Sequence, residues 1–296
     1  MANALTTLTH TLLAQTALEA FLVDIAPLMV FARNFSDTAA QRGDKVKVPF
    51  ISAADAAVNF AGTYTIQDAD AEGKDITLDK HKFVSWGLTD LELVNNPQVE
   101  LERFARQKGH QLAKAVFQDI MSQVTNANYG AAIFTGAASS FDSDDLVDIR
   151  EDLVQAGFPE IGRALILKET YYSYLLKDND VKDASFSGTT DPIQQGAVRR
   201  LLGMDIYEST LIPANGENLV GVACHPDGIL FAGRYLAPQP GHNYANAQAV
   251  TDPQTGITLG FREWYDNDTG TMKRVLEVLY GYQVGNTSAL KRLVSA

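Results

Sequence analysis

The sequence predicts an α+β protein, and three features of the chain carry this prediction. Residues 257–284 form two runs rich in β-branched and aromatic side chains, separated by the turn-forming segment Asp266–Gly270, a pattern typical of a long two-stranded ribbon. Residues 96–125 carry apolar side chains at helical spacing, which predicts one long helix. Residues 143–232 alternate short helix and strand patterns, as a compact α/β unit does.

The first element, residues 1–44, has the pattern of an apolar helix. Apolar side chains between Leu12 and Met29 recur near helical spacing, and Pro27 followed by residues 34–43 ends the pattern. Two interpretations stay open for this segment. The helix belongs to the core of its own chain, or the segment is an arm that packs on a neighbouring subunit.

A hairpin is predicted next. Lys45–Phe50 alternates polar and apolar residues, and Pro49 confines such a strand to the edge of a sheet because proline lacks a backbone donor. Residues 63–66 and 76–86 also alternate, around the charged segment Asp68–Asp75, which predicts a long hairpin with a charged tip. A hairpin with little core of its own is unstable alone, so it should lie against another part of the molecule or another subunit.

The long helix is predicted to begin at Asn96-Pro97, because Asn is a favoured N-cap and Pro fits the first helical position. Running to Thr125, it would be about 43 Å long at 1.5 Å per residue. Gly109 inside it costs up to about 1 kcal/mol of helix propensity relative to Ala, which suggests a close crossing with another element. The predicted apolar stripe contains Leu101, Phe104, Leu112, Val116, Ile120 and Val124.

The α/β unit is predicted from short periodic segments between turn residues. Ser143 should cap a helix over residues 144–156, which Gly157 ends. The further elements in chain order are a strand over 164–167, a helix over 169–177, strands over 203–208 and 219–224, and a short helix over 229–232 that opens after His225-Pro226-Asp227-Gly228.

Composition limits the classes of function. The 296 residues carry a formal net charge of −12, which argues against a nucleic-acid-binding surface because phosphate affinity comes from clustered Lys and Arg. Apolar residues make up 46% of the chain, as in an ordinary folded protein. Cys224 is the single cysteine, so an intrachain disulfide is excluded. No apolar run has the length of a membrane span, and we expect neither a signal peptide nor a membrane partner.

No recognised catalytic motif occurs, and we predict no catalytic, cofactor-binding or metal-binding residue. Asp68, Asp70, Glu72 and Asp79 have a spacing similar to that of a calcium loop, but strand patterns flank them, so a solvated hairpin tip is favoured. Cys224-His225 could suggest a nucleophile and its base. Adjacent residues of a strand point to opposite faces, so a buried, structural Cys224 is favoured instead.

The order of these elements resembles the major capsid protein of tailed bacteriophages. The local motifs that carry the resemblance are Val222–Gly228, and Asp266–Gly270 followed by Leu279-Tyr280-Gly281. The resemblance implies a tailed-phage major-capsid fold. Its parts would be an N-terminal arm (1–44), an extended β-hairpin loop (45–95), a peripheral domain with the long spine helix and β-ribbon (96–130 and 250–296), and an axial α/β domain (131–249).

The function that this resemblance implies is a structural one. Hexamers and pentamers of the chain would assemble in the host bacterial cytoplasm into the icosahedral shell of a virion, which encloses double-stranded DNA without binding it specifically. A scaffolding protein and a portal protein would be partners, and a decoration protein could bind outside. The candidates for assembly contacts are Asp68, Asp70, Glu72, Lys74, Asp75, Lys80, Lys82 and Trp86.

The chain departs from some capsid lineages in one respect, and two alternative functions stay open. Some capsid lineages crosslink subunits through a Lys–Asn isopeptide bond, and Lys74 or Lys80 lies in the matching loop, but no Asn or carboxylate partner is identified, so we expect no crosslink. An encapsulin-like nanocompartment shell would share the fold and enclose enzymes. A soluble α/β enzyme without a recognisable motif is the alternative from another class.

Overall fold

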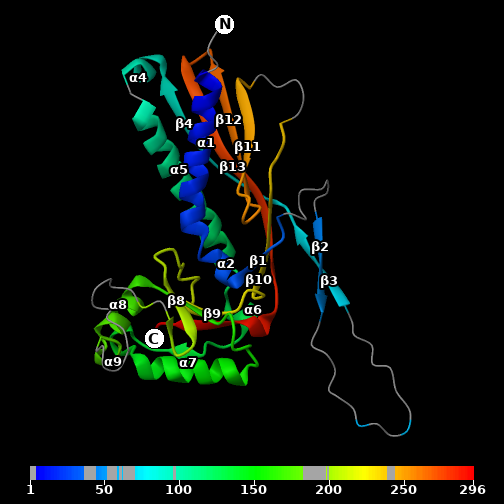
Figure 1. Cartoon of the computed structure of the whole chain (residues 1–296), viewed down its shortest axis with the longest axis vertical. Helices are drawn as coiled ribbons and strands as arrows, with labels where there is room; N and C mark the ends of the chain where they lie inside the picture. Colours follow the sequence, from blue (N-terminus) through cyan, green and yellow to red (C-terminus); the bar gives the residue numbers. More distant parts are fainter. Residues whose placement is uncertain are drawn as a thin grey trace.

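The structure is a computed structural model that describes residues 5–36, 45–51, 59, 62, 71–95, 98–182, 198, 200–238 and 244–296. Figure 1 shows an elongated molecule in which one sheet with its helices forms the upper part and a second sheet with its helices forms the lower part. A separate two-stranded hairpin stands beside this body.

The first sheet is built around β13 (Thr271–Val284), the long second arm of the predicted ribbon. One edge of β13 pairs antiparallel with β4 (Lys80–Thr89), and the other pairs with β12 (Thr258–Asp266) and then with β10 (Ile229–Arg234). The strands β1 (Ala32–Asn34) and β11 (Asn246–Thr251) complete this sheet. The predicted ribbon is confirmed.

The turn between β12 and β13 forms as its residue types predict. The Asp266 carboxylate accepts hydrogen bonds from the Asp268 backbone N–H (3.1 Å) and the Thr269 hydroxyl (2.8 Å), and it pairs with the Lys273 ammonium. Gly270 has a φ of +60°, a conformation that glycine adopts without strain. These local bonds fix the register in which Asp266 lies opposite Thr271.

Two long helices cover this sheet. The helix α1 (Leu5–Ile25), followed by α2 (Leu28–Phe31), packs on α5 (Gln98–Met121), which follows the short α4 (Asp90–Asn95). The main hydrophobic cluster combines helix residues Leu112, Val116 and Ile120 with Leu276 and Tyr280 of β13. The predicted spine helix and its packing on the ribbon are therefore confirmed.

Two details of α5 can be compared with the sequence. A Cβ atom added at Gly109 would lie 2.3 Å from the backbone oxygen of Ala17, so Gly109 does mark the close crossing of α1 and α5. The prediction that Phe104 belongs to the buried stripe is wrong, because Phe104 is 39% exposed and Ala105 is fully buried. Eight residues turn an α-helix about 80° past two full turns, whereas the seven residues from Ala105 to Leu112 nearly complete them.

The N-terminal segment is a core element in its own chain. Leu13, Ala17 and Phe21 of α1 are buried in the main cluster against α5. Of the two interpretations of residues 1–44, the structure therefore shows the core helix for the described side chains of α1.

The second sheet forms the α/β part, and its strand order is β5-β14-β9-β6-β8-β7. The strands are β5 (Phe134–Thr135), β14 (Leu290–Val294), β9 (Leu219–Cys224), β6 (Ala164–Leu167), β8 (Met204–Glu208) and β7 (Arg200–Leu201), and the helices are α6 (Asn126–Tyr129), α7 (Ser143–Gln155), α8 (Glu169–Lys177) and α9 (Asn179–Lys182). Apolar side chains of α7 and α8 bury against this sheet in a second cluster. The predicted cap is one residue off, because Asp142 caps α7 through a capping box with Asp145.

Two segments differ from the sequence analysis in their partners. Residues 229–232, predicted as a short helix, belong to strand β10, which is buried between β1 and β13. Its side chains Ile229, Leu230 and Phe231 favour a strand that is buried on both faces. The C-terminal strand β14 (Leu290–Val294), which the predicted division groups with the ribbon in 250–296, pairs with β9 in the second sheet.

A hairpin forms in this region, but different strands from the predicted 63–66 and 76–86 build it. The strand β2 (Lys45–Ile51) pairs antiparallel with β3 (Ala71–Thr77), so part of the predicted charged tip is strand, and the predicted second arm, residues 76–86, runs mostly into β4. The predicted first arm, residues 63–66, lies outside the described residues. The buried side of the hairpin explains the register, because Val46, Val48 and Ile76 pack together against β10.

Candidate assembly surfaces

The hairpin of β2 and β3 is the most prominent surface feature of the described chain. Figure 1 shows both strands beside the body, directed away from both sheets. Among its described side chains, those of the inner side are anchored, where Val46, Val48 and Ile76 contact Leu230 and Ala232 of β10. The hairpin therefore has its root in the core, and its described outward side chains Lys45, Lys47, Asp75 and Thr77 are exposed.

Lys74 fastens this hairpin to the body. The Lys74 ammonium donates hydrogen bonds to the backbone oxygens of Val284 (3.1 Å) and Gly285 (2.7 Å), at the end of β13. A cation is well placed there because charged donors bind carbonyl oxygens more strongly than neutral ones. Lys74 is thus an internal anchor in this chain.

The other hairpin candidates divide into described and undescribed residues. Asp75 is exposed on β3, opposite Lys47 in the register. Glu72 lies opposite Phe50 in the same pair of strands, and its side chain is outside the described part of the structure. Asp68 and Asp70 also lie outside the described residues. Of these acidic candidates, Asp75 alone has a described, exposed side chain.

The candidates on β4 make contacts within their own chain. The Lys82 ammonium donates to the backbone oxygen of Ala115 in α5 (2.9 Å) and lies 3.7 Å from the Asp119 carboxylate. The Lys80 ammonium lies 4.9 Å from the centre of the Tyr282 ring. Trp86 packs on Phe261, with ring centroids 6.1 Å apart. These three even-numbered side chains join β4 to the helix layer and to β12 and β13.

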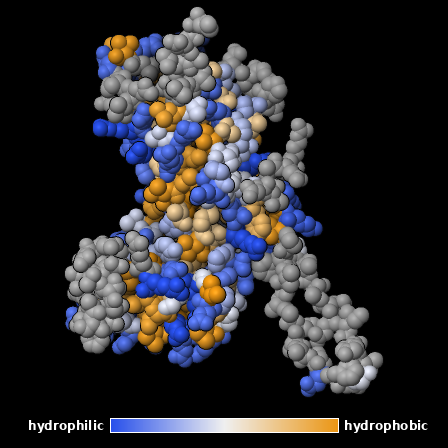
Figure 2. Space-filling model, in the orientation of Figure 1, coloured by the Kyte–Doolittle hydropathy of each residue, from blue (hydrophilic) through white to orange (hydrophobic). Residues whose placement is uncertain are grey.

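The opposite face of β4 carries a surface feature that the sequence analysis missed. Side chains alternate along a strand, so Phe83 points away from the side that holds Lys82, and it is 61% exposed. At the far end of the same strand, Leu91 and Val94 of α4 are 72% and 84% exposed. Figure 2 shows this apolar patch at the α4 end. The sequence did contain an indication of this exposure, because Phe83 and Lys82 are neighbours in an alternating strand and must point to opposite faces.

Buried ion pairs join β12 to β13. Arg274 pairs with Glu263 at 2.9 Å, and both side chains are at least 95% buried. Arg262 pairs with Glu277 at 2.5 Å, and His81 of β4 lies 3.1 Å from the same carboxylate. Removing one partner of such a pair is costly because it leaves an uncompensated buried charge. These buried charges therefore pair with one another inside the sheet, across β12, β13 and β4.

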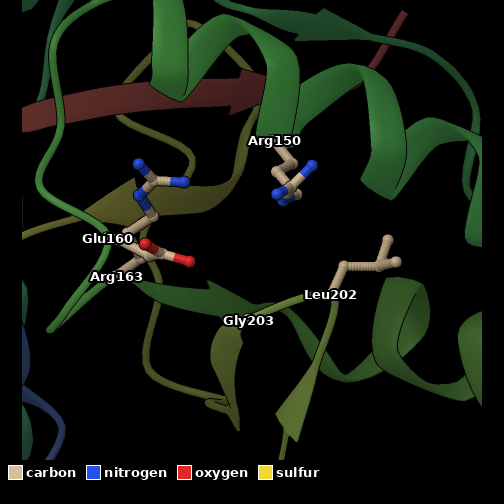
Figure 3. A pocket seen from close by; sticks show the side chains of 5 residues that line it. All are labelled: Arg150, Glu160, Arg163, Leu202 and Gly203. Carbon is tan, nitrogen blue, oxygen red and sulfur yellow. The ribbon is translucent and has the colours of Figure 1, made fainter.

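The α/β part holds a cavity of about 430 Å³ lined by Arg150, Glu160, Arg163, Leu202 and Gly203. Figure 3 shows Arg150 reaching into it from α7, with Arg163 and Glu160 on one side and Leu202 on the other. Sequence reasoning missed this site, because its residues come from three separate segments.

The groups that could do chemistry are dispersed or buried. Cys224 is fully buried, and burial raises the pKa of its thiol, which disfavours the thiolate. The His225 imidazole lies 3.8 Å from the Asp227 carboxylate. Among the described residues, no three His, Cys, Asp or Glu side chains are grouped as a metal site would need. No described helix has the length and apolarity to cross a membrane.

Comparison with solved structures gives the fold. The chain is similar to a structure of Mycobacterium phage Che8 (16% identity, TM-score 0.63, covering 88% of each chain) and to the capsid structure of the cyanophage P-SCSP1u (16% identity, TM-score 0.61, covering 90% of this chain and 86% of that one). It is also similar to a virus-like particle from Pyrococcus furiosus (15% identity, TM-score 0.53, covering 94% and 98%). No family model and no curated protein matches the sequence.

The similarities to the two phage structures cover between 86% and 90% of both chains in each pair, so they concern most of the fold and not one part of it. The chain therefore has the fold of tailed-phage major capsid proteins.

Proposed function

We propose that this chain is a major capsid protein, which assembles with copies of itself into the icosahedral shell of a tailed bacteriophage. The observation that carries the proposal is the capsid fold, which extends over 88% of this chain and 88% of the Che8 chain. Similarity over only one part would fit a shared module, whereas similarity over the whole length fits a shared architecture.

The surface of the chain supports an assembly role. The hairpin of β2 and β3 is anchored at its root and leaves its remaining surface for a neighbour. Exposed apolar side chains, among them Phe83 and Val94, would be covered by adjacent subunits. Each contact can be weak, because a shell makes many at once and closes without leaving an unsatisfied interface. In this role the candidates Asp68, Asp70, Glu72 and Asp75 would contact neighbours, whereas Lys74, Lys80, Lys82 and Trp86 would position the hairpin and β4.

The remaining parts of the proposal follow from the shell role. Hexamers and pentamers would form in the host cytoplasm and enter the virion, with a scaffolding protein and a portal protein as partners. The net charge of −12 would let packaged DNA lie inside without adhering to the wall. The chain would have no enzymatic activity. The proposed division into parts is 1–44, 45–95, 96–130 with 250–296, and 131–249. Two elements depart from it, because α1 packs in the core with α5 and β14 belongs to the second sheet.

Negative-stain microscopy of the purified protein tests the proposal. We expect rings, tubes or closed shells when the protein is expressed alone or with its scaffold. Dispersed monomers in every such preparation would contradict the shell function and favour an enzyme of the α/β class.

A nanocompartment shell is the second candidate, and one observation favours it. The match with the virus-like particle from Pyrococcus furiosus covers 98% of that particle's chain, although its TM-score of 0.53 is below the 0.63 and 0.61 of the Che8 and P-SCSP1u structures. The contents of purified particles separate the two functions. Protected double-stranded DNA supports the phage capsid, and a co-purifying enzyme of fixed stoichiometry supports the nanocompartment.

A further inference from the structure

The cavity of Figure 3 contains two arginines whose charges are not neutralised within the described part of the chain. Arg150 is exposed on α7 and makes no ion pair or hydrogen bond with its side chain there. Glu160 lines the same cavity, but no ion pair joins it to either arginine. With Arg163, the site has one net positive charge. It lies in a chain whose overall charge is strongly negative.

Arg163 is held in place as a binding group would be. The side chain is 7% exposed, its Nε donates to the Pro159 backbone oxygen (2.8 Å), and its Nη2 donates to the Phe158 backbone oxygen (2.7 Å). These bonds fix the guanidinium and leave Nη1 without a described partner at the cavity. A guanidinium that is already ordered loses little further freedom when it binds an anion.

Apolar side chains lie next to this charged site. Ile161, between Glu160 and Arg163 in the chain, is 86% exposed, and Leu202 is 41% exposed with a φ of +51°. Val154, one turn after Arg150 on α7, is 50% exposed. Exposed apolar side chains next to arginines are typical of a surface that another protein covers, because Arg is enriched at such interfaces.

The complementary surface is on the same helix. Asp148 and Asp152 lie two residues before and after Arg150, and at 3.6 residues per turn both are about 160° from it around α7. Neither carboxylate has a hydrogen-bonded or ion-paired partner among the described residues. Partial burial and the charges of Asp142, Asp148 and Asp144 raise the pKa of Asp145 beside them, so negative charge is concentrated on this flank.

We propose that the cavity of Arg150 and Arg163 binds a carboxylate of Asp148 or Asp152 from a second copy of this chain. A carboxylate pairs with guanidinium groups through charge-assisted hydrogen bonds, and its single charge matches the net charge of the site. Because the two complementary flanks are on opposite sides of one helix, the contact is head-to-tail, and head-to-tail contacts generate rings when the rotation closes. The inference rests on the proposed shell function, and it identifies an ion-pair contact within a ring.

Charge reversal and its rescue test this contact. Arg150→Glu should raise the protein concentration at which particles form by about tenfold or more, as loss of an interfacial charge pair does. The variant Asp148→Lys with Asp152→Lys should have a similar defect. Combining all three substitutions restores opposite charges at each contact, so particle formation should return towards the original concentration. Sedimentation and electron microscopy over a series of protein concentrations measure the concentration at which particles form.

Arg103→Glu is the matched control, since Arg103 is an exposed arginine on α5 and the change in net charge is the same. Each variant is first shown by thermal unfolding to keep the stability of the parent chain. Assembly of Arg150→Glu at the parent concentration overturns this inference and leaves the shell function in place. Single variants that fail with no rescue overturn the acidic flank as the ligand. A parent chain that never assembles overturns the proposed function itself.

Discussion

At the residue scale, the close contact between α1 and α5 decides much of the core. Gly109 allows the backbone of α1 to approach because it has no Cβ atom, and the Ala17 oxygen occupies the space that a Cβ atom would need. Around this crossing, Leu112 and Val116 are fully buried. The glycine is therefore retained in the helix for packing, at a cost in helix propensity of about 1 kcal/mol.

Truncation of the buried stripe should destabilise the subunit. Leu112→Ala removes a fully buried side chain, and such changes cost about 2–5 kcal/mol in the free energy of unfolding. Lys114→Ala, on the exposed side of the same helix, should change it by less than about 0.5 kcal/mol. Denaturant unfolding of the two variants measures the difference. Small and equal effects would mean that α5 does not pack through this stripe.

Substitution of the crossing glycine should also destabilise, although alanine is the better helix former. In Gly109→Ala the new methyl group would lie 2.3 Å from the Ala17 oxygen, so the helices must move apart. We expect a lower melting temperature for Gly109→Ala, and an unchanged or slightly higher one for Gln107→Ala at an exposed position. A more stable Gly109→Ala protein would place the two helices further apart than described.

At the element scale, local patterns predicted the elements whose partners are close in sequence. The ribbon of β12 and β13 and the helix α8 follow from alternation, turn residues and helical spacing. Predictions failed where distant partners decide. Residues 229–232 are a strand because β1 and β13 flank them, and β3 pairs with β2 because Val46, Val48 and Ile76 share one buried face. The arginine cavity could not be predicted from the sequence, because its residues lie in separate segments that meet only in the folded chain.

Loss of the Lys74 anchor should loosen the hairpin. Lys74→Met removes the hydrogen bonds to the Val284 and Gly285 oxygens, and bonds to charged groups contribute about 1.5–3 kcal/mol each. Hydrogen exchange of β2 and β3 should accelerate, while exchange in α5 stays as it is. Lys47→Met, at an exposed position on the same hairpin, serves as the control. Equal protection of the hairpin in both variants would show that Lys74 does not fasten it.

The stability that Asp266 contributes to the β12–β13 turn should decrease as the pH falls. Hydrogen bonds from Lys273 and Thr269 lower the pKa of Asp266 to about 2, below its ordinary value of 3.8. A carboxylate with a lowered pKa in the folded state adds stability above its unfolded pKa, and this contribution is lost as the pH falls from about 3.8 to about 2. The melting temperature of Asp266→Asn should therefore be lower than that of the parent chain at pH 5, and the difference should vanish near pH 2. A difference independent of pH would contradict this role.

At the scale of the whole molecule, two sheets that share one main hydrophobic cluster, a further cluster in the α/β part, and a hairpin anchored at its root form one elongated subunit. Such a subunit leaves apolar side chains exposed at α4 and beside the arginine cavity. It also carries Arg150 on one side of α7 and Asp148 and Asp152 on the opposite side. Copies that cover these surfaces for one another would make a closed shell, in which no such surface stays free.

Sedimentation velocity of the purified chain, with electron microscopy of the fast-sedimenting fraction, tests this account most directly. The account predicts large particles of uniform size with icosahedral or ring symmetry, formed above a threshold protein concentration and weakened by high salt, which screens the charged contacts. A single species with the 32.2 kDa mass of one chain, at every concentration and with or without a scaffold, would contradict it.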